Sequence, residues 1–218
     1  MWHSFIPSVS LKVHSSVVRT MVSTSASSKN IHQLKNVLST NFKAVAVHPR
    51  EEMIKQYPFT ANNVKEHYLF SEESMKRLEW DMMLDREKMI LWSFITFKEG
   101  CLLGNTQGFA HGGLLSAIFD GALGSLFTMI GESGFTANLN INYCKPVTIP
   151  SVLMLRAEVI ERDGRKLWIG GELTDANIDE NGYGCSNNVV GEEENNGRGM
   201  RNHVYVNGKG LFLSAVRN

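Results

Sequence analysis

The feature that most constrains the fold is a long apolar segment, residues 111–130, which the sequence predicts to be a single helix. Its large apolar side chains are distributed almost all round the helix, and one carboxylate, Asp120, stands near the middle. A helix on a protein surface is apolar along one stripe only, so a helix of this kind must be wrapped by other elements. The candidate wrapper is a largely antiparallel sheet, which makes the chain an α+β protein.

Strand signals flank this helix and supply the predicted sheet. The segment after the helix alternates with period two, with Phe135 and other apolar residues on one side and Thr136 and three asparagines on the other. A hairpin signal at Asp163-Gly164 joins two later strands. The predicted strands are residues 90–97, 135–143, 152–160, 167–173 and, as a closing strand or hairpin, 203–216.

Two further segments are predicted to lie outside this core. Residues 50–89 are charged and are predicted to be helical, with a helix start at Ser71. Residues 175–202 hold seven asparagines and an acidic run, Glu192-Glu193-Glu194, with few large apolar residues. Such a composition favours a flexible insertion over a packed element.

The N-terminal segment has the composition of an organelle transit peptide. Residues 1–50 hold six Lys or Arg and no Asp or Glu, whereas residues 51–218 hold 16 basic and 22 acidic residues. The first 28 residues are rich in Ser and Thr, and Lys12, His14 and Arg19 interrupt the apolar run that a secretory signal needs. We therefore expect a transit peptide and flexible leader over residues 1–43 and a location in the mitochondrial matrix, with the cytoplasm as the alternative.

Composition also excludes several classes of function. A formal net charge of zero argues against a strong electrostatic nucleic-acid binder. Asp120 interrupts the most apolar helix candidate, so no membrane span is expected. The three cysteines lack CxxC spacing and the histidines lack metal-ligand spacing, which predicts neither a disulfide framework nor a metal site.

The start of the long helix carries the first sign of chemistry, His111-Gly112-Gly113. Glycines let a ligand approach the backbone closely, and the first N–H groups of a helix have no partner within it. Such a terminus can hold a phosphate or a developing oxyanion. His111 could cap the helix, orient a group or transfer protons, and a simple capped helix start is the alternative.

Asp120 is the second sign of chemistry. A carboxylate among apolar side chains is costly to bury unless it is paired or lies in a cleft. Gly113, Ala117, Gly121 and Gly124 form a stripe of small residues beside it, which permits close approach by a partner helix or a thin substrate. A general base or nucleophile is favoured over a surface aspartate.

Three motifs together resemble a known family. They are HGGLLSAIFDGALG at 111–124, TANLNINYCKP at 136–146 and ERDGRK at 161–166. The sequence resembles a hotdog-fold acyl-coenzyme A thioesterase of the PaaI-like group, and most of all the mitochondrial thioesterase superfamily members with a transit peptide and an N-terminal helical extension. The resemblance covers about residues 70–174. It implies a helical extension over residues 44–89 and a hotdog domain over residues 90–218.

The resemblance also implies roles for individual residues. Asp120 matches the catalytic carboxylate, and the backbone N–H of Gly112 or Gly113 matches the oxyanion donor. Asn105 matches a residue that helps to polarise the carbonyl, and Thr136 matches one that orients the water. The reaction needs no metal or organic cofactor, because a thioester is already activated, and coenzyme A is part of the substrate. Two subunits pair, as a homodimer or a dimer of dimers, and the active sites lie at their interface.

The coenzyme A part of the substrate is expected to meet a separate set of residues. Its phosphates need cations, and the nearby ones are Lys145, Arg162, Arg165 and Lys166, although an ordinary solvated hairpin tip is the alternative. Relatives often place a base directly after the Tyr of the second motif, where this chain has Cys144. The candidate substrate-binding residues are Asn142, Lys145, Arg165, Lys166, Leu167 and Trp168.

Two other functions remain open from the residues alone. A hotdog enoyl- or hydroxyacyl-coenzyme A hydratase-dehydratase would use a histidine paired with an acid, and His111 and Asp120 supply both. A non-catalytic acyl-coenzyme A-binding protein would use the N-terminal extension and the insertion as partner surfaces. The spacing of the HGG motif favours the thioesterase, which would hydrolyse a fatty or other acyl thioester to free acid and coenzyme A.

Overall fold

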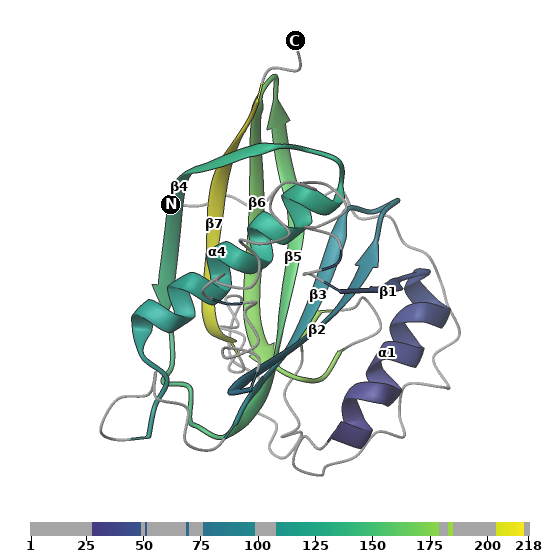
Figure 1. The fold of residues 1–218 in the computed structure, drawn as a ribbon, viewed down its shortest axis with the longest axis vertical. Coiled ribbons are helices and arrows are strands. Elements are labelled where there is room, and N and C mark those ends of the chain that lie inside the picture. Colours follow the sequence, from purple (N-terminus) through teal and green to yellow (C-terminus); the bar gives the residue numbers. More distant parts are fainter. Residues whose placement is uncertain are drawn as a thin grey trace, which may run out of the picture.

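A computed structural model describes residues 28–48, 51, 69, 76–98, 108–178, 183–184 and 204–215. Seven antiparallel strands form one sheet in the order β1-β2-β3-β5-β6-β7-β4, and the helix α4 crosses its inner face (Figure 1). This arrangement is the predicted α+β hotdog fold. The elements are α1 (Ser28–Phe42), β1 (Val45–Val47), β2 (Leu78–Asp85), β3 (Ile90–Phe97), α4 (Gly112–Met129), β4 (Gly134–Tyr143), β5 (Ser151–Asp163), β6 (Lys166–Asp175) and β7 (Val204–Ser214).

The central helix α4 is wrapped by the sheet as predicted. Ten of its residues are buried, and they pack against alternate side chains of the strands in the main core. The sheet can approach α4 closely at Gly171, where an added Cβ would lie 3.1 Å from the side chain of Leu123. By length and composition α4 could cross a membrane, but it is here the core helix of the sheet.

The strand β4 lies at the edge of the sheet and contains a bulge. Its register with β7 shifts between Thr136 and Asn138. A bulge reverses the alternation of side chains along a strand. Thr136, before the bulge, therefore faces α4, and Leu139 and Ile141, after the bulge, face it too. The predicted strand is therefore confirmed, but the prediction that Thr136 lies on the side opposite to these two residues is wrong.

The helix α1 covers part of the outer face of the sheet. Leu34 and Leu38, together with other apolar residues of α1, pack on Trp92, Phe94 and Met154 in a second core. Lys35 adds an ion pair of 2.9 Å to Asp81. The expectation of a flexible leader over residues 1–43 is therefore wrong for residues 28–42, because their apolar stripe has a sheet face to cover.

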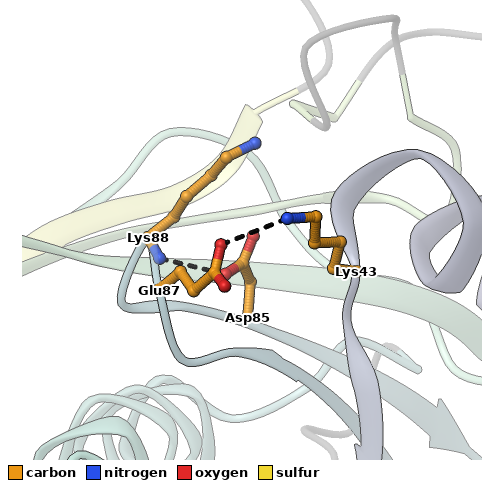
Figure 2. A network of polar contacts seen from close by, with 4 residues as sticks. All are labelled: Lys43, Asp85, Glu87 and Lys88. Carbon is orange, nitrogen blue, oxygen red and sulfur yellow. Dashed lines mark hydrogen bonds and ion pairs between the residues drawn. The ribbon is translucent and has the colours of Figure 1, made fainter.

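Polar contacts join the end of α1 to the turn between β2 and β3 (Figure 2). The Lys43 ammonium lies 3.5 Å from a carboxylate oxygen of Glu87, and the buried carboxylate of Asp85 accepts the backbone N–H of Lys88 at 2.9 Å. The Lys88 ammonium stands over the Phe42 ring, 5.3 Å from its centroid. These contacts connect the C-terminus of α1 to this turn.

The predicted helical extension over residues 44–89 is wrong where the structure describes it. Residues 78–85 form β2 and residues 45–47 form β1, so the sheet begins well before residue 90. The first half of β2 alternates buried Leu78 and Trp80 with exposed neighbours, a strand period. Its second half is continuously buried because α1 and α4 cover the two faces there, and the apolar run Met82-Met83-Leu84 within it resembles a helical stripe. The predicted helix start at Ser71 lies outside the described residues.

The remaining strands agree with the sequence. β5 and β6 form a hairpin whose two-residue turn contains Gly164 with φ of +55°, a value that favours glycine. β7 is the predicted closing strand and lies between β6 and β4. Of the predicted insertion, residues 175–178 and 183–184 are described, and Ile178 and Gly184 form an isolated bridge.

Candidate active site

Asp120 and Thr136 meet between α4 and β4. Asp120 is half-buried in the middle of the helix, and the Thr136 hydroxyl donates a hydrogen bond of 2.9 Å to its Oδ1 atom. The bulge in β4 turns the hydroxyl toward the helix. The contact holds one carboxylate oxygen and leaves Oδ2 to accept a proton. We call this pair the carboxylate half-site.

The start of α4 is a second polar cluster. His111 is the N-cap, and its Nδ1 atom accepts the backbone N–H of Gly113 at 2.9 Å. In a neutral imidazole this leaves the proton on Nε2. Within the described part of the chain the backbone N–H of Gly112 has no acceptor. Of the two predicted oxyanion donors, Gly112 is therefore the one available, because Gly113 already binds the cap.

Two hydroxyls bind the carbonyl of Gly112 from the other side. Ser116 Oγ lies 3.0 Å and Tyr143 Oη 3.2 Å from this carbonyl oxygen, and both are at hydrogen-bond distance. The two hydroxyls are also at hydrogen-bond distance from each other, and since each has one proton, two of these three hydrogen bonds form at a time. Neither residue is predicted from the sequence to have a role, although Tyr143 ends the asparagine-rich motif at β4. We call His111, Gly112, Gly113, Ser116 and Tyr143 the helix-start half-site.

Within one chain the two half-sites are too far apart to act on one carbonyl. Asp120 lies eight positions after Gly112, which corresponds to about 12 Å along a helix. An oxyanion donor must lie about 3 Å from the oxygen that it stabilises. A base that acts through one water must also lie within a few ångströms of the same carbonyl. Within one chain the two clusters therefore cannot act together on the same carbonyl group.

The hairpin residues of the predicted substrate set lie at the level of the carboxylate half-site. Leu167 pairs with Phe212, which in turn pairs with Thr136 on β4. The Leu167 side chain is buried in the core, and the Lys209 ammonium stands over the Trp168 ring at 4.6 Å. Arg165 and Lys166 are exposed at the turn.

Some of these hairpin cations already have partners. Lys166 lies 3.9 Å from Asp163, and Arg162 forms an ion pair of 2.7 Å with Glu132. Arg165 is exposed at the same tip. The proposed contact with phosphate stays a prediction for Arg165 and Lys166.

Asn142 and Lys145 lie at the other end of the sheet. Asn142 pairs with Asn207, five residues before Phe212 on β7, which corresponds to about 17 Å along a strand. The Asn142 side chain donates to Asn207 Oδ1 at 2.9 Å on the face away from α4. Lys145 is exposed, and its backbone N–H donates to the Tyr205 carbonyl.

A hollow of about 670 Å³ lies on this outer face, where Arg156, Glu172 and Asn142 form part of its lining. These residues belong to one cross-strand row on the side of the sheet opposite to Asp120. The hollow is therefore distinct from the carboxylate half-site. Asn142 lies at the same end of the sheet as the helix-start half-site, but its side chain is on the opposite face of the sheet.

Asn105 lies outside the residues that the structure describes, and its role stays a prediction. In the described ranges no three His, Cys, Asp or Glu side chains gather as a metal site would require. Tyr205 offers a contrast to Tyr143. Burial and the nearby Asp175, which accepts its hydroxyl at 2.9 Å, raise the pKa of Tyr205 to about 12, so it is a protonated donor at neutral pH.

Comparison with known proteins relates these half-sites to a family. Residues 107–180 match the profile of the thioesterase superfamily, and this segment contains α4, β4 and both half-sites. Both polar clusters therefore lie in the segment that is similar to this superfamily.

Several curated relatives are acyl-coenzyme A thioesterases by name. THEM4 of Rattus norvegicus is 30% identical over 142 residues, which are 65% of this chain and 56% of that protein. THEM4 of Bos taurus is 38% identical over 73 residues, 34% of this chain and 30% of the relative. MIOREX complex component 3 of Saccharomyces cerevisiae is 35% identical over 81 residues, 36% of this chain and 30% of the relative. The chain thus spans between about a third and just over half of these relatives.

Solved structures with thioesterase names are similar as well. Zebra fish thioesterase superfamily member 2 has a TM-score of 0.48 and 14% identity, covering 72% of this chain and 94% of that one. A hypothetical thioesterase from Streptococcus pneumoniae with coenzyme A has a TM-score of 0.47 and 17% identity, covering 76% and 99%.

Proposed function

We propose that this chain hydrolyses an acyl-coenzyme A thioester to a free acid and coenzyme A. The observation that carries the proposal is the hydrogen bond between Thr136 and Asp120, which fixes a carboxylate inside the segment that is similar to the thioesterase superfamily. The names of the curated relatives support the same reaction. A thioester is already activated, so one base and one oxyanion donor suffice for its hydrolysis.

In the proposed reaction Asp120 acts on a water molecule. Its free Oδ2 atom takes a proton from the water as the oxygen attacks the thioester carbonyl. The carbonyl oxygen becomes an oxyanion and accepts the N–H of Gly112. The tetrahedral centre then collapses, the carbon–sulfur bond breaks, and the sulfur leaves with the proton that Asp120 held. Direct attack by the Asp120 carboxylate is the alternative first step. It would break the carbon–sulfur bond, release coenzyme A as the thiolate and form an anhydride, which water then opens to the free acid and the Asp120 carboxylate.

The proposed enzyme works as a homodimer. A second copy related by a two-fold axis could bring its Gly112 to the Asp120 of the first, since one chain holds them about 12 Å apart. The edge strand β4 supports this arrangement, because its outer edge has no partner strand within the described residues. Phe135 and Tyr143, exposed by 63% and 53%, stand near its two ends and would be covered by a partner.

We also propose that the protein works in mitochondria. The acid-free, hydroxyl-rich leader supports this location. Any removal of the leader would occur before α1, because α1 contributes Leu34 and Leu38 to a buried core. Fractionation of cells that express the tagged full chain tests the location, and recovery of the tag in the cytosol alone would contradict it.

The reaction is tested by thiol release from a panel of acyl-coenzyme A substrates, from short to long chains and including aryl groups. We expect Asp120→Asn to lower kcat by about 10²-fold or more, because the amide cannot accept the proton. Asp175→Asn is the matched control, since Asp175 also accepts a hydroxyl at 2.9 Å but lies in neither half-site. Its activity should stay near that of the wild type.

Two outcomes would contradict the proposal. An Asp120→Asn protein of wild-type activity would exclude the carboxylate mechanism. A folded wild-type protein that releases thiol from no substrate would exclude the reaction, and hydration of an enoyl-coenzyme A would then test the hydratase. Binding of acyl-coenzyme A without either reaction would favour a non-catalytic binder.

A further inference from the structure

The first turn of α4 is held by more contacts than a helix start needs. The His111 side chain accepts a hydrogen bond from the N–H of Gly113. The hydroxyls of Tyr143 and Ser116 lie at hydrogen-bond distance from the carbonyl oxygen of Gly112. The Gly112 carbonyl and the Gly113 N–H belong to the same peptide group. That single peptide group is therefore bound on both of its polar atoms by side chains.

Consecutive glycines make this restraint significant. Gly112 and Gly113 have no side chains, so their backbone is free to adopt conformations that other residues avoid. An oxyanion donor stabilises a transition state only if it is already aimed at the developing charge. The neighbouring donor, the N–H of Gly112, shares its Cα with the restrained peptide group. Side-chain contacts that fix this group therefore also fix the direction of the donor.

Tyr143 is well placed to be the main restraint. It is the last residue of β4, so its hydroxyl ties the helix start to the sheet rather than to the helix itself. Ser116 lies one turn further along α4 and moves with the helix. An added Cβ at Gly112 would lie 3.8 Å from the Tyr143 ring, so the ring also lies against this turn.

We propose that Tyr143 is a positioning residue that fixes the oxyanion-binding turn of α4, with Ser116 as its hydrogen-bonded partner. The proposal rests on the proposed thioesterase function and deepens it. Tyr143 acts through the Gly112–Gly113 peptide group and carries no proton in the reaction. Its loss should therefore impair the chemical step more than the binding of substrate.

The first experiment compares steady-state kinetics of four full-length proteins. Tyr143→Phe keeps the ring and removes the hydroxyl, Ser116→Ala removes its partner, and the double variant removes both. We expect Tyr143→Phe to lower kcat about tenfold with little change in KM, less than the 10²–10³-fold loss of a direct oxyanion donor. Because the two hydroxyls are hydrogen-bonded to each other, removal of one also disturbs the other, so the double variant should lose less than the product of the two single losses.

Tyr205→Phe is the matched control. Tyr205 also lies on an edge-proximal strand and donates its hydroxyl at 2.9 Å, but its acceptor is Asp175. Loss of this bond should affect stability without changing kcat. If Tyr143→Phe and Tyr205→Phe reduce kcat equally, or if Tyr143→Phe leaves kcat unchanged, the positioning role is wrong.

A second readout does not depend on activity. In protein labelled with ¹⁵N-glycine, loss of the hydroxyl that polarises the Gly112 carbonyl should shift the amide resonance of Gly113 in Tyr143→Phe but not in Tyr205→Phe. An unchanged Gly113 resonance would overturn the proposal. If the Gly113 resonance shifts but the wild-type protein hydrolyses no thioester, the restraint by Tyr143 is supported and the proposed function is overturned.

Discussion

At the scale of single residues, the site depends on which polar atoms remain available. His111 uses Nδ1 to cap its own helix, which turns a candidate proton carrier into a residue that shapes the helix start. Thr136 uses its hydroxyl to hold Asp120, so one carboxylate oxygen remains for chemistry. The N–H of Gly112 is left as the donor for an oxyanion. His111 and Thr136 thus position the groups that act in the proposed reaction, the Gly112 N–H and the Asp120 carboxylate.

The role of the Gly112 N–H can be tested without disturbing the helix. Proline at the first helical position is compatible with the helix start and removes the N–H. The preceding residue, His111, has φ of −68° and ψ of 138°, which is the extended conformation that a following proline requires. We expect Gly112→Pro to lower kcat about 10²–10³-fold, as for other lost oxyanion donors. Steady-state kinetics measure the loss, and circular dichroism checks that helix content is kept.

Wild-type activity in a folded Gly112→Pro protein would mean that another group is the oxyanion donor. Gly108→Ala is a useful comparison, because Gly108 has φ of +79° in the segment before the helix. Strain there should lower stability and leave the donor intact.

Among the helices and strands, the sequence correctly predicts the ones whose residue pattern has a single structural cause. α4, the β5–β6 hairpin and β7 were predicted because apolar periodicity and turn residues agree. The strand β2 was predicted as a helix because two different layers bury its two faces. The bulge in β4 has no local signature in the sequence, since it depends on the register with β7. The restraint at Tyr143 could not be predicted either, because it joins residues 31 positions apart.

The helix α1 is expected to be part of the stable fold. Leu38 is fully buried against the second core, so Leu38→Ala should lower the free energy of unfolding by about 2–5 kcal/mol. Urea unfolding of the chain from residue 28 onward measures the change. Lys43→Ala removes an exposed ion pair of the same helix terminus and should have little effect. Equal stability of the wild type and Leu38→Ala would mean that α1 does not pack as described.

At the scale of the whole molecule, the proposed division of the site between two copies can be tested directly. Asp120→Asn and Gly112→Pro damage different half-sites. In a heterodimer of the two variants, one of the two active sites combines the intact halves and the other combines the damaged ones. We expect the purified heterodimer, selected through two different tags, to recover about half of the wild-type activity.

Either variant alone should stay nearly inactive as a homodimer. A heterodimer as inactive as its parents would mean that each chain completes its own site, and the distance along α4 would then need another explanation. If sedimentation experiments show that the fully active wild-type protein is a monomer, the shared site is contradicted directly.

The spacing of eight positions from Gly112 to Asp120 also has a genetic consequence. If each site takes one residue from each subunit, two defective alleles of the gene need not be equivalent. Alleles damaged at opposite ends of this span would complement each other in one cell, whereas two alleles damaged at the same end would not. A single defective allele beside a normal one would leave every mixed dimer with one working site, so its effect would be recessive wherever half of the activity is enough.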